Sequence, residues 1–323
     1  MDKINRFKKV KKEWTAFQSN NKKVRIRDAA NQMKVSEAEL LSTEVGADTF
    51  YLSVDNIEHF FKELFSVDKI MLLIRSNVVV HEVVVKPKSL QLQGDKILNI
   101  EDNKSLVLSF NDNLFKHIFY QKKVHSNKEL RSFQIFDKKG AAVLKIYLKG
   151  QDKSIFDQIA LKYMVSYEYE LQSDFKLSLV SASRSNLIQK VDLYFINGEG
   201  IQDSSEFKLK KAPLRQILDD VSKSRLPVQV HGVGEGTIQY YRGVIKNIID
   251  YGPWINVIDK DFNLHVLENE LSESIIINYE ITDCNYCSIE FFDREGNHVL
   301  GITSVYGYEE DFNNIMNNLK DIK

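Results

Sequence analysis

The chain of 323 residues repeats one short segment in each half, and this repetition constrains its fold more than any other feature. Phe133-Gln-Ile-Phe-Asp-Lys-Lys-Gly140 is similar to Ile289-Glu-Phe-Phe-Asp-Arg-Glu-Gly296, and aligning Phe136 with Phe292 gives an offset of 292 − 136 = 156 residues. Each copy is followed by a helical pattern, near residues 154–162 and 309–319. Because this period is far longer than a solenoid unit, it indicates a duplicated domain. We expect two similar repeats, residues 1–165 and 166–323.

Short β-favouring runs separated by polar turns fill most of the first half. They predict strands at residues 70–74, 78–85, 90–92, 97–100, 106–110, 117–120, 133–136 and 143–148. Ser36 followed by Glu39 is a capping box that predicts the start of a helix, and residues 55–65 have an apolar helical face. Short strands at even spacing indicate a large antiparallel sheet. The predicted fold class is α+β, internally duplicated, with two large antiparallel sheets that each carry helices on one face.

Composition excludes several classes of protein. The net charge of −1 argues against a nucleic-acid binder, although residues 1–27 are basic. That basic segment predicts a solvated amphipathic helix, and the alternative is an arm that binds polyanions. The sequence contains no run of about 18 apolar residues, so we expect no membrane span. The N-terminal residues lack the apolar core of a signal peptide, so we expect none. With only two cysteines, the chain suits a reducing compartment, and we expect it in the cytoplasm.

Seven histidines and two cysteines are the residues with metal chemistry. The histidines show no paired spacing, so a protein-built zinc site is not predicted. Cys284 and Cys287 have redox or metal spacing without a second pair, and we expect a structural role beside a hairpin turn. His81 lies within an apolar predicted strand, where a histidine is either a hydrogen-bonded core group or a ligand.

One stretch carries more specific information. Residues 252–268 read Gly-Pro-Trp-Ile-Asn-Val-Ile-Asp-Lys-Asp-Phe-Asn-Leu-His-Val-Leu-Glu, and their alternation predicts a β-hairpin turning at Asp259–Asp261. This sequence resembles the signature motif of the HemS/HmuS-type hemin-degrading (haem utilisation) protein family. Residues 27–40, with Arg-Asp-x-Ala followed by Val-Ser-Glu-Ala-Glu-Leu, resemble the start of the same proteins. That family is also internally duplicated, so the resemblance covers nearly the whole chain.

The resemblance implies haem as the bound group and assigns two residues to it. The family motif Arg-Asn-Glu-x-x-Val-His-Glu aligns with residues 75–82, which makes His81 the axial ligand of haem iron. Arg75 would meet a haem propionate, and its alternative is a solvated turn residue. His265 lies within the predicted hairpin. Either it is a functional residue, or its side chain simply points off the strand into a polar layer. The family's helical Asp-Val-His-Gln-Phe-Phe motif is absent between Lys162 and Leu214, and the nearest wording is Asn56-Ile-Glu-His59-Phe-Phe61.

These implications predict a cytoplasmic haem-binding protein of iron acquisition. If it is an enzyme, it is a haem-degrading oxygenase that releases iron, in which haem itself supplies the chemistry. The alternatives are a non-catalytic haem carrier or buffer, and a duplicated-fold interaction protein without haem. The expected partners are haem itself and a haem importer or an electron donor, with no nucleic acid.

Overall fold

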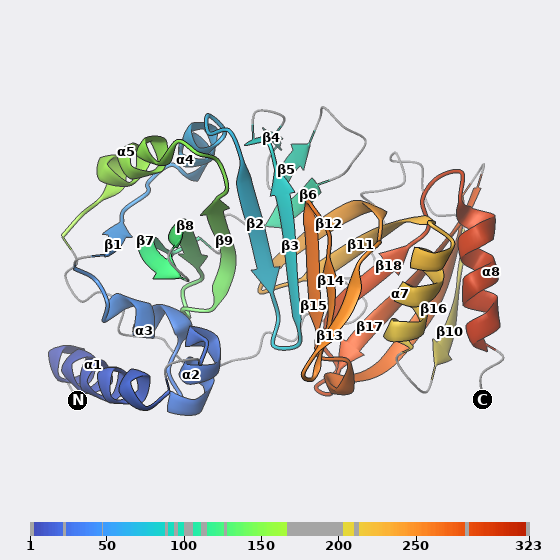
Figure 1. The fold of residues 1–323 in the computed structure, drawn as a ribbon, viewed down its shortest axis with the longest axis horizontal. Helices are drawn as coiled ribbons and strands as arrows, with labels where there is room; N and C mark the ends of the chain where they lie inside the picture. The colour runs from blue at the N-terminus through green and yellow to red at the C-terminus, as the bar shows by residue number, and fades with distance from the viewer. Residues whose placement is uncertain are drawn as a thin grey trace. The chain divides into compact units, whose positions relative to one another are not determined.

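The computed structural model describes residues 3–21, 24–46, 48–87, 90–93, 96–99, 106–110, 115–125, 128–166, 203–209, 213–281 and 284–320. Its strands form two antiparallel sheets of nine strands each, as the predicted fold class requires (Figure 1). The helices are α1 Lys3–Asn20, α2 Ile26–Met33, α3 Glu37–Ser42, α4 Ile57–Leu64, α5 Lys153–Tyr163, α7 Leu214–Lys223 and α8 Glu309–Lys320. Among the described helices, none is long and apolar enough to cross a membrane.

Apart from β1 Thr49–Leu52, which the sequence did not predict, the strands of the first half of the sequence lie close to their predicted positions. They are β2 Ile70–Arg75, β3 Val79–Val85, β4 Leu90–Gln93, β5 Lys96–Asn99, β6 Leu106–Phe110, β7 His117–His125, β8 Lys128–Phe136 and β9 Ala142–Leu148. The strands of the second half are β10 Asp203–Leu209, β11 Pro227–Val233, β12 Thr237–Val244, β13 Ile248–Tyr251, β14 Trp254–Ile258, β15 Phe262–Val266, β16 Leu271–Ile281, β17 Cys284–Asp293 and β18 His298–Thr303.

The chain divides into two compact units. Unit 1 comprises Met1–Leu73, Val84–Asp95 and Phe110–Leu179, and unit 2 comprises Ile74–Val83, Lys96–Ser109 and Val180–Lys323. Within unit 1, the strands follow the order β1-β7-β8-β9-β2. Unit 2 holds the series β10-β16-β17-β18-β11-β12-β6-β5 and the series β3-β15-β14-β13. All of β5 and most of β3 and β6 therefore lie in unit 2 although they come from the first half of the sequence.

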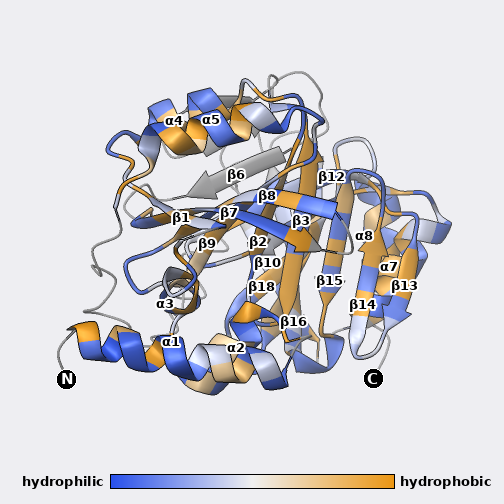
Figure 2. Ribbon diagram, turned by 60° about the vertical axis from the view of Figure 1, so that its left-hand side comes forward, coloured by the Kyte–Doolittle hydropathy of each residue, from blue (hydrophilic) through white to orange (hydrophobic). Residues whose placement is uncertain are grey.

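Aromatic side chains join the helices of unit 1 to its sheet. The ring of Phe133 in β8 lies 5.3 Å from that of Phe60 in α4 and 4.8 Å from that of Phe156 in α5. All three side chains are fully buried. Figure 2 shows that α4 and α5 carry both hydrophobic and hydrophilic residues, as helices that cover one face of a sheet should. The N-terminal segment packs as well, because Val10 and Trp14 of α1 are buried against α2 and α3.

The repeated segment folds in the same way in both units. Asp137 ends the pairing of β8 with β9, and its Oδ1 accepts hydrogen bonds from the backbone N–H groups of residues 139 and 141 at 2.9 and 2.8 Å. Asp293 does the same for residues 295 and 297 at 3.0 and 2.8 Å. Gly140 and Gly296 follow with φ of 79° and 80°, which suits glycine. The predicted equivalence of Phe136-Asp137 with Phe292-Asp293 is confirmed.

The order of elements repeats around this turn. The series β1-β7-β8-β9-β2 of unit 1 has its counterpart in β10-β16-β17-β18-β11 of unit 2. A helix precedes β2 and β11 in the chain, and another follows β9 and β18. In unit 2, α8 packs against both β17 and α7. Duplication therefore extends over whole sets of elements, while the limits 1–165 and 166–323 stay a prediction.

Candidate functional site

His81 lies in the interior of unit 2. It belongs to β3, where it pairs with Leu264 of β15, and it is fully buried. Its Nε2 lies 3.3 Å from the carbonyl oxygen of Val230, and Gln239 Nε2 lies 3.0 Å from its Nδ1. Phe262 contacts the ring edge to face at 5.1 Å between centroids. Both ring nitrogens thus meet protein groups, as in a hydrogen-bonded core histidine.

Burial determines the charge of His81. It lowers the pKa of His81 to about 3, so the ring is neutral at physiological pH. A neutral imidazole is the form that ligates haem iron. His81 also packs closely against the backbone of β11. A Cβ atom at Gly232 would lie 2.6 Å from His81 Cβ. Only glycine at position 232 allows β11 to approach this ring. Whether His81 also ligates iron stays a prediction.

Arg75 occupies the end of the strand that precedes His81. It is the last residue of β2, half-buried, and the turn that follows is fixed by Ser76. The Ser76 hydroxyl accepts hydrogen bonds from the N–H groups of Val78 and Val79 at 3.2 and 3.0 Å. Arg75 and His81 therefore lie on the two strands of one hairpin. A propionate contact of Arg75 stays a prediction.

The other histidines that the sequence singled out have structural partners. His59 is in α4, with 62% of its side chain exposed, and its Nε2 lies 3.1 Å from Glu63 Oε1. His265 lies in the predicted hairpin, which forms as β14 and β15, and its Nδ1 is 2.6 Å from Asn256 Oδ1. Asn256 in turn donates to the carbonyl oxygens of Ile249 and Trp254 at 3.1 Å each. His265 thus belongs to a local polar network of the hairpin.

The cysteines lie where the sequence predicts. Cys284 is the first residue of β17, which pairs with β16, and Cys287 follows in the same strand. The thiol of Cys287 is fully buried, and its backbone N–H donates to Ser304 Oγ at 3.0 Å. Cys287 is therefore part of the packed sheet.

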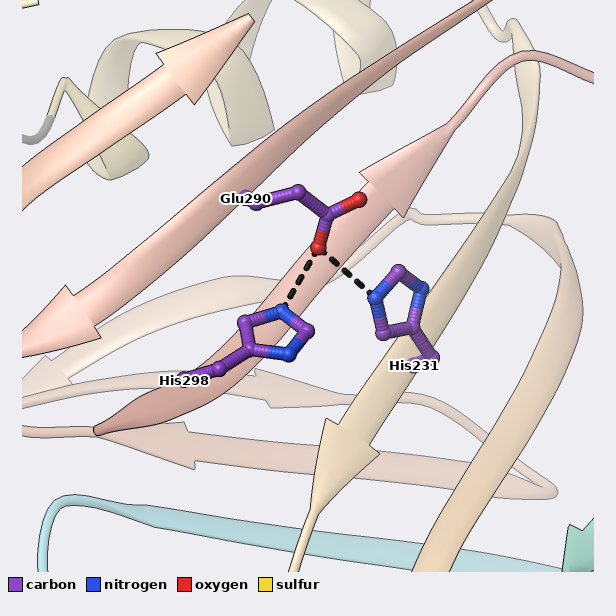
Figure 3. Close-up of side chains that lie close together, drawn as sticks. All are labelled: His231, Glu290 and His298. Carbon is purple, nitrogen blue, oxygen red and sulfur yellow. Dashed lines mark hydrogen bonds and ion pairs between the residues drawn. The ribbon is translucent and has the colours of Figure 1, made fainter. Parts of the chain in front are cut away.

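The structure brings together three side chains that sequence spacing did not connect. His231 of β11, Glu290 of β17 and His298 of β18 meet in the interior of unit 2 (Figure 3). Glu290 Oε2 lies 2.9 Å from His231 Nε2 and 2.7 Å from His298 Nε2. All three side chains are buried. They are 59 and 8 residues apart along the chain, so only the strand pairing unites them.

Glu290 is ionised in this cluster. Burial alone would raise its pKa, but the charge and hydrogen bonds of His231 and His298 outweigh burial and hold the pKa of Glu290 below its usual value. The rings of His231 and His298 lie 5.6 Å apart between centroids. The arrangement offers two imidazole nitrogens and one carboxylate oxygen at a single point, which is a ligand set for a transition-metal ion.

The two halves of the chain match one protein family. Residues 34–163 and 199–319 match the sequence profile of the "Haemin-degrading HemS.ChuX domain". The chain belongs to this family. The hemin transport protein HmuS of Yersinia pestis is 24% identical over 308 residues, which cover 87% of this chain and 86% of HmuS. The hemin transport protein HemS of Yersinia enterocolitica is 22% identical over 93% of this chain and 92% of HemS.

Solved structures of similar fold cover almost the entire chain. The heme degrading enzyme ChuS of Escherichia coli O157:H7 superposes with a TM-score of 0.80 at 22% identity, over 96% of this chain and 98% of ChuS. The heme-binding protein PhuS of Pseudomonas aeruginosa, in its apo form, gives 0.79 at 20% identity over 96% and 98%. The duplicated two-sheet fold predicted from the sequence is therefore confirmed.

Arg215 in the first turn of α7 is held by two carboxylates. Its Nε lies 3.1 Å from Asp219 and its Nη1 lies 2.5 Å from Asp250. The sequence Asp-Val-His-Gln-Phe-Phe does not occur in α7, which begins with Leu214 and Arg215. A guanidinium has no free lone pair for iron, so Arg215 cannot supply an axial ligand.

Proposed function

We propose that this chain binds haem in the cytoplasm and serves haem utilisation. The observation that carries the proposal is the match of both halves to a haemin-degrading domain family. Its full-length similarity to two hemin transport proteins supports the same role. Haem is the cargo or substrate in this proposal.

His81 is the proposed axial ligand, and its chemistry suits that role better than its packing does. The neutral ring has the lone pair that iron requires. Its nitrogens, however, are engaged with Val230 and Gln239, so coordination needs the ring to leave one of these partners. Arg75, at the end of the adjacent strand, is the proposed partner of a propionate.

The proposal has a catalytic and a non-catalytic form. In the catalytic form the chain is a haem-degrading oxygenase, and reduced haem supplies the oxygen chemistry. The protein would bind and orient the ring and exclude water, and an electron donor would be its partner. In the non-catalytic form the chain carries or buffers haem, and a haem importer would be its partner.

A second candidate function is an interaction protein that has lost haem binding. Two observations favour it. The family's helical histidine motif is absent between Lys162 and Leu214, and the ring of His81 is enclosed by protein groups. In this case the duplicated fold would be retained for contacts with another protein.

Absorbance spectroscopy separates these functions. Haemin is titrated into the purified protein, and the haem-loaded protein is then reduced with ascorbate in air. Loss of the Soret band with release of chelatable iron supports the oxygenase, and an unchanged band supports the carrier. A wild-type protein that gives no saturable spectral change would instead support the interaction protein. His59→Ala is the matched control for a His81→Ala variant, because it also removes a histidine but one whose side chain is exposed.

A further inference from the structure

We propose that His231, Glu290 and His298 bind one divalent transition-metal ion of the zinc class. The ligand atoms of the three residues all lie within 4.8 Å of one another, and they come from three different strands of unit 2 (Figure 3). The proposal does not depend on haem binding, because His81 and Arg75 take no part in it.

The donor set selects the class of metal. Two imidazole nitrogens with one carboxylate oxygen suit zinc, and the same set suits ferrous iron, whereas magnesium and calcium prefer oxygen ligands alone. Three protein ligands leave a fourth position for a small exogenous ligand such as water.

The backbone is built to make room for the cluster. Gly301 of β18 pairs with Glu290 on one side and with His231 on the other, so it lies between them in the sheet. A Cβ atom at Gly301 would lie 2.1 Å from His231 Nε2 and 2.2 Å from Glu290 Oε2. The missing side chain therefore creates the space in which the carboxylate and the ring meet.

The carboxylate of Glu290 has an unused ligand atom. Oε2 accepts hydrogen bonds from Nε2 of both imidazole rings, while Oε1 is buried and has no hydrogen-bond partner in the structure. A buried carboxylate oxygen without a partner is costly. A cation at this point would neutralise the carboxylate and engage the second oxygen.

Unit 1 shows how the duplicated fold treats the same position when no such cluster is present. Gln134 and Lys145 pair across β8 and β9 as Glu290 and Gly301 pair across β17 and β18, with the offset of 156 residues that relates the repeats. Ala142 stands at the place of His298. Lys145 forms a buried ion pair with Glu37. At this position unit 1 has the ammonium group of a lysine, whereas unit 2 has a glycine.

Metal entry requires a small rearrangement. Donor atoms bound to one tetrahedral zinc ion are about 3.3 Å apart, given zinc–nitrogen distances of about 2.0–2.1 Å. The present contacts of 2.9 and 2.7 Å are therefore shorter by a few tenths of an ångström. In a neutral ring the proton moves from Nε2 to Nδ1, where it needs a new acceptor, because neither Nδ1 atom has a hydrogen-bond partner in the structure.

The test measures zinc on the full-length, haem-free protein. The protein is equilibrated with chelator, then with Zn²⁺, desalted and analysed for metal by mass spectrometry. We expect about one zinc per chain and a higher melting temperature. Glu290→Gln and His298→Gln should weaken zinc binding at least about 100-fold, whereas His59→Gln, which changes an exposed histidine of α4, should not.

X-ray absorption of the zinc-loaded wild type keeps the test decisive if a variant does not fold. The proposed site gives nitrogen and oxygen neighbours at about 2.0–2.1 Å, whereas a cysteine site would show sulfur at about 2.3 Å. Sulfur neighbours, zinc content below about 0.1 per chain, or unchanged zinc binding by a folded His298→Gln variant would each overturn the proposal. The three side chains would then be a buried ion cluster alone.

Discussion

Gly301 and His231 fit together because Gly301 has no side chain: an added Cβ atom would lie 2.1 Å from Nε2 of that ring. Gly301→Ala should therefore displace His231 and lower the free energy of unfolding by about 1–3 kcal/mol, the usual cost of overpacking a core. Chemical denaturation followed by circular dichroism measures this difference.

The matched control is Gly150→Ala in unit 1. There an added Cβ atom would be 3.4 Å from Asp68 Cβ, an ordinary contact. We expect a much smaller effect at this position. Equal stability of Gly301→Ala and wild type would show that the sheet relaxes around the new methyl group, and the close fit of Gly301 to His231 would then carry no energy.

The repeated turn predicts matched effects in the two units. Asp137→Ala and Asp293→Ala each remove an acceptor of two backbone N–H groups. Each variant should lose about 1–3 kcal/mol of unfolding free energy, because these donors lose their bonds near the core. Thermal unfolding of both variants checks this expectation. Destabilisation of only one variant would contradict an equivalent role for the two turns.

Asp157 predicts a pH-dependent contribution in unit 1. Burial raises its pKa, but hydrogen bonds from Arg131, Tyr120 and Lys122 outweigh burial and lower the pKa of Asp157 to about 2. Arg131 Nε and Nη2 each lie 3.1 Å from this carboxylate. Because the folded pKa lies below the usual 3.8, the stabilisation is complete above about pH 5 and is lost as pH falls towards 2.

Asp157→Asn tests that sign. At pH 7 the variant should be less stable by about 1–2 kcal/mol, a value that allows for partial solvent screening. The difference from wild type should shrink as the pH falls from 5 to 2. Denaturant titrations at several pH values measure it, and a difference that is constant over this range would contradict the ionised role of Asp157.

Local patterns predicted the elements well because their causes are local. Alternation placed the hairpin of β14 and β15, and the capping box placed α3, where Ser36 Oγ accepts from Glu39 N–H at 3.0 Å. The repeated Phe-Asp segment predicted the duplication. These features depend on residues a few positions apart, which a single sequence displays directly.

The cluster of His231, Glu290 and His298 could not be predicted in this way. Its members come from β11, β17 and β18, and the pairing of those strands is non-local. The space for the cluster depends on Gly301, whose role appears only when β18 lies between β17 and β11. His81 is intermediate: its apolar strand predicted burial, while the partners Val230 and Gln239 come from the other half of the chain.

His81→Ala separates the two roles of this histidine. Removing the ring leaves a cavity and takes the Nδ1 acceptor from Gln239, so the variant should lose about 1–3 kcal/mol of unfolding free energy. If His81 also ligates iron, the Soret band should shift and haem affinity should fall about 100-fold. Melting temperature and haem spectrum are measured on the same preparation. A destabilised variant with the wild-type haem spectrum would assign His81 to the core alone.

Whether this chain binds haem can be measured by titrating haemin into the wild-type protein and recording the difference spectrum. We expect a Soret change that saturates, with a dissociation constant of about 1 µM or tighter, equivalent to about 8 kcal/mol of binding free energy. An absorbance that rises linearly, as it does for haemin added to buffer, would show that the protein does not bind haem and would favour the interaction protein.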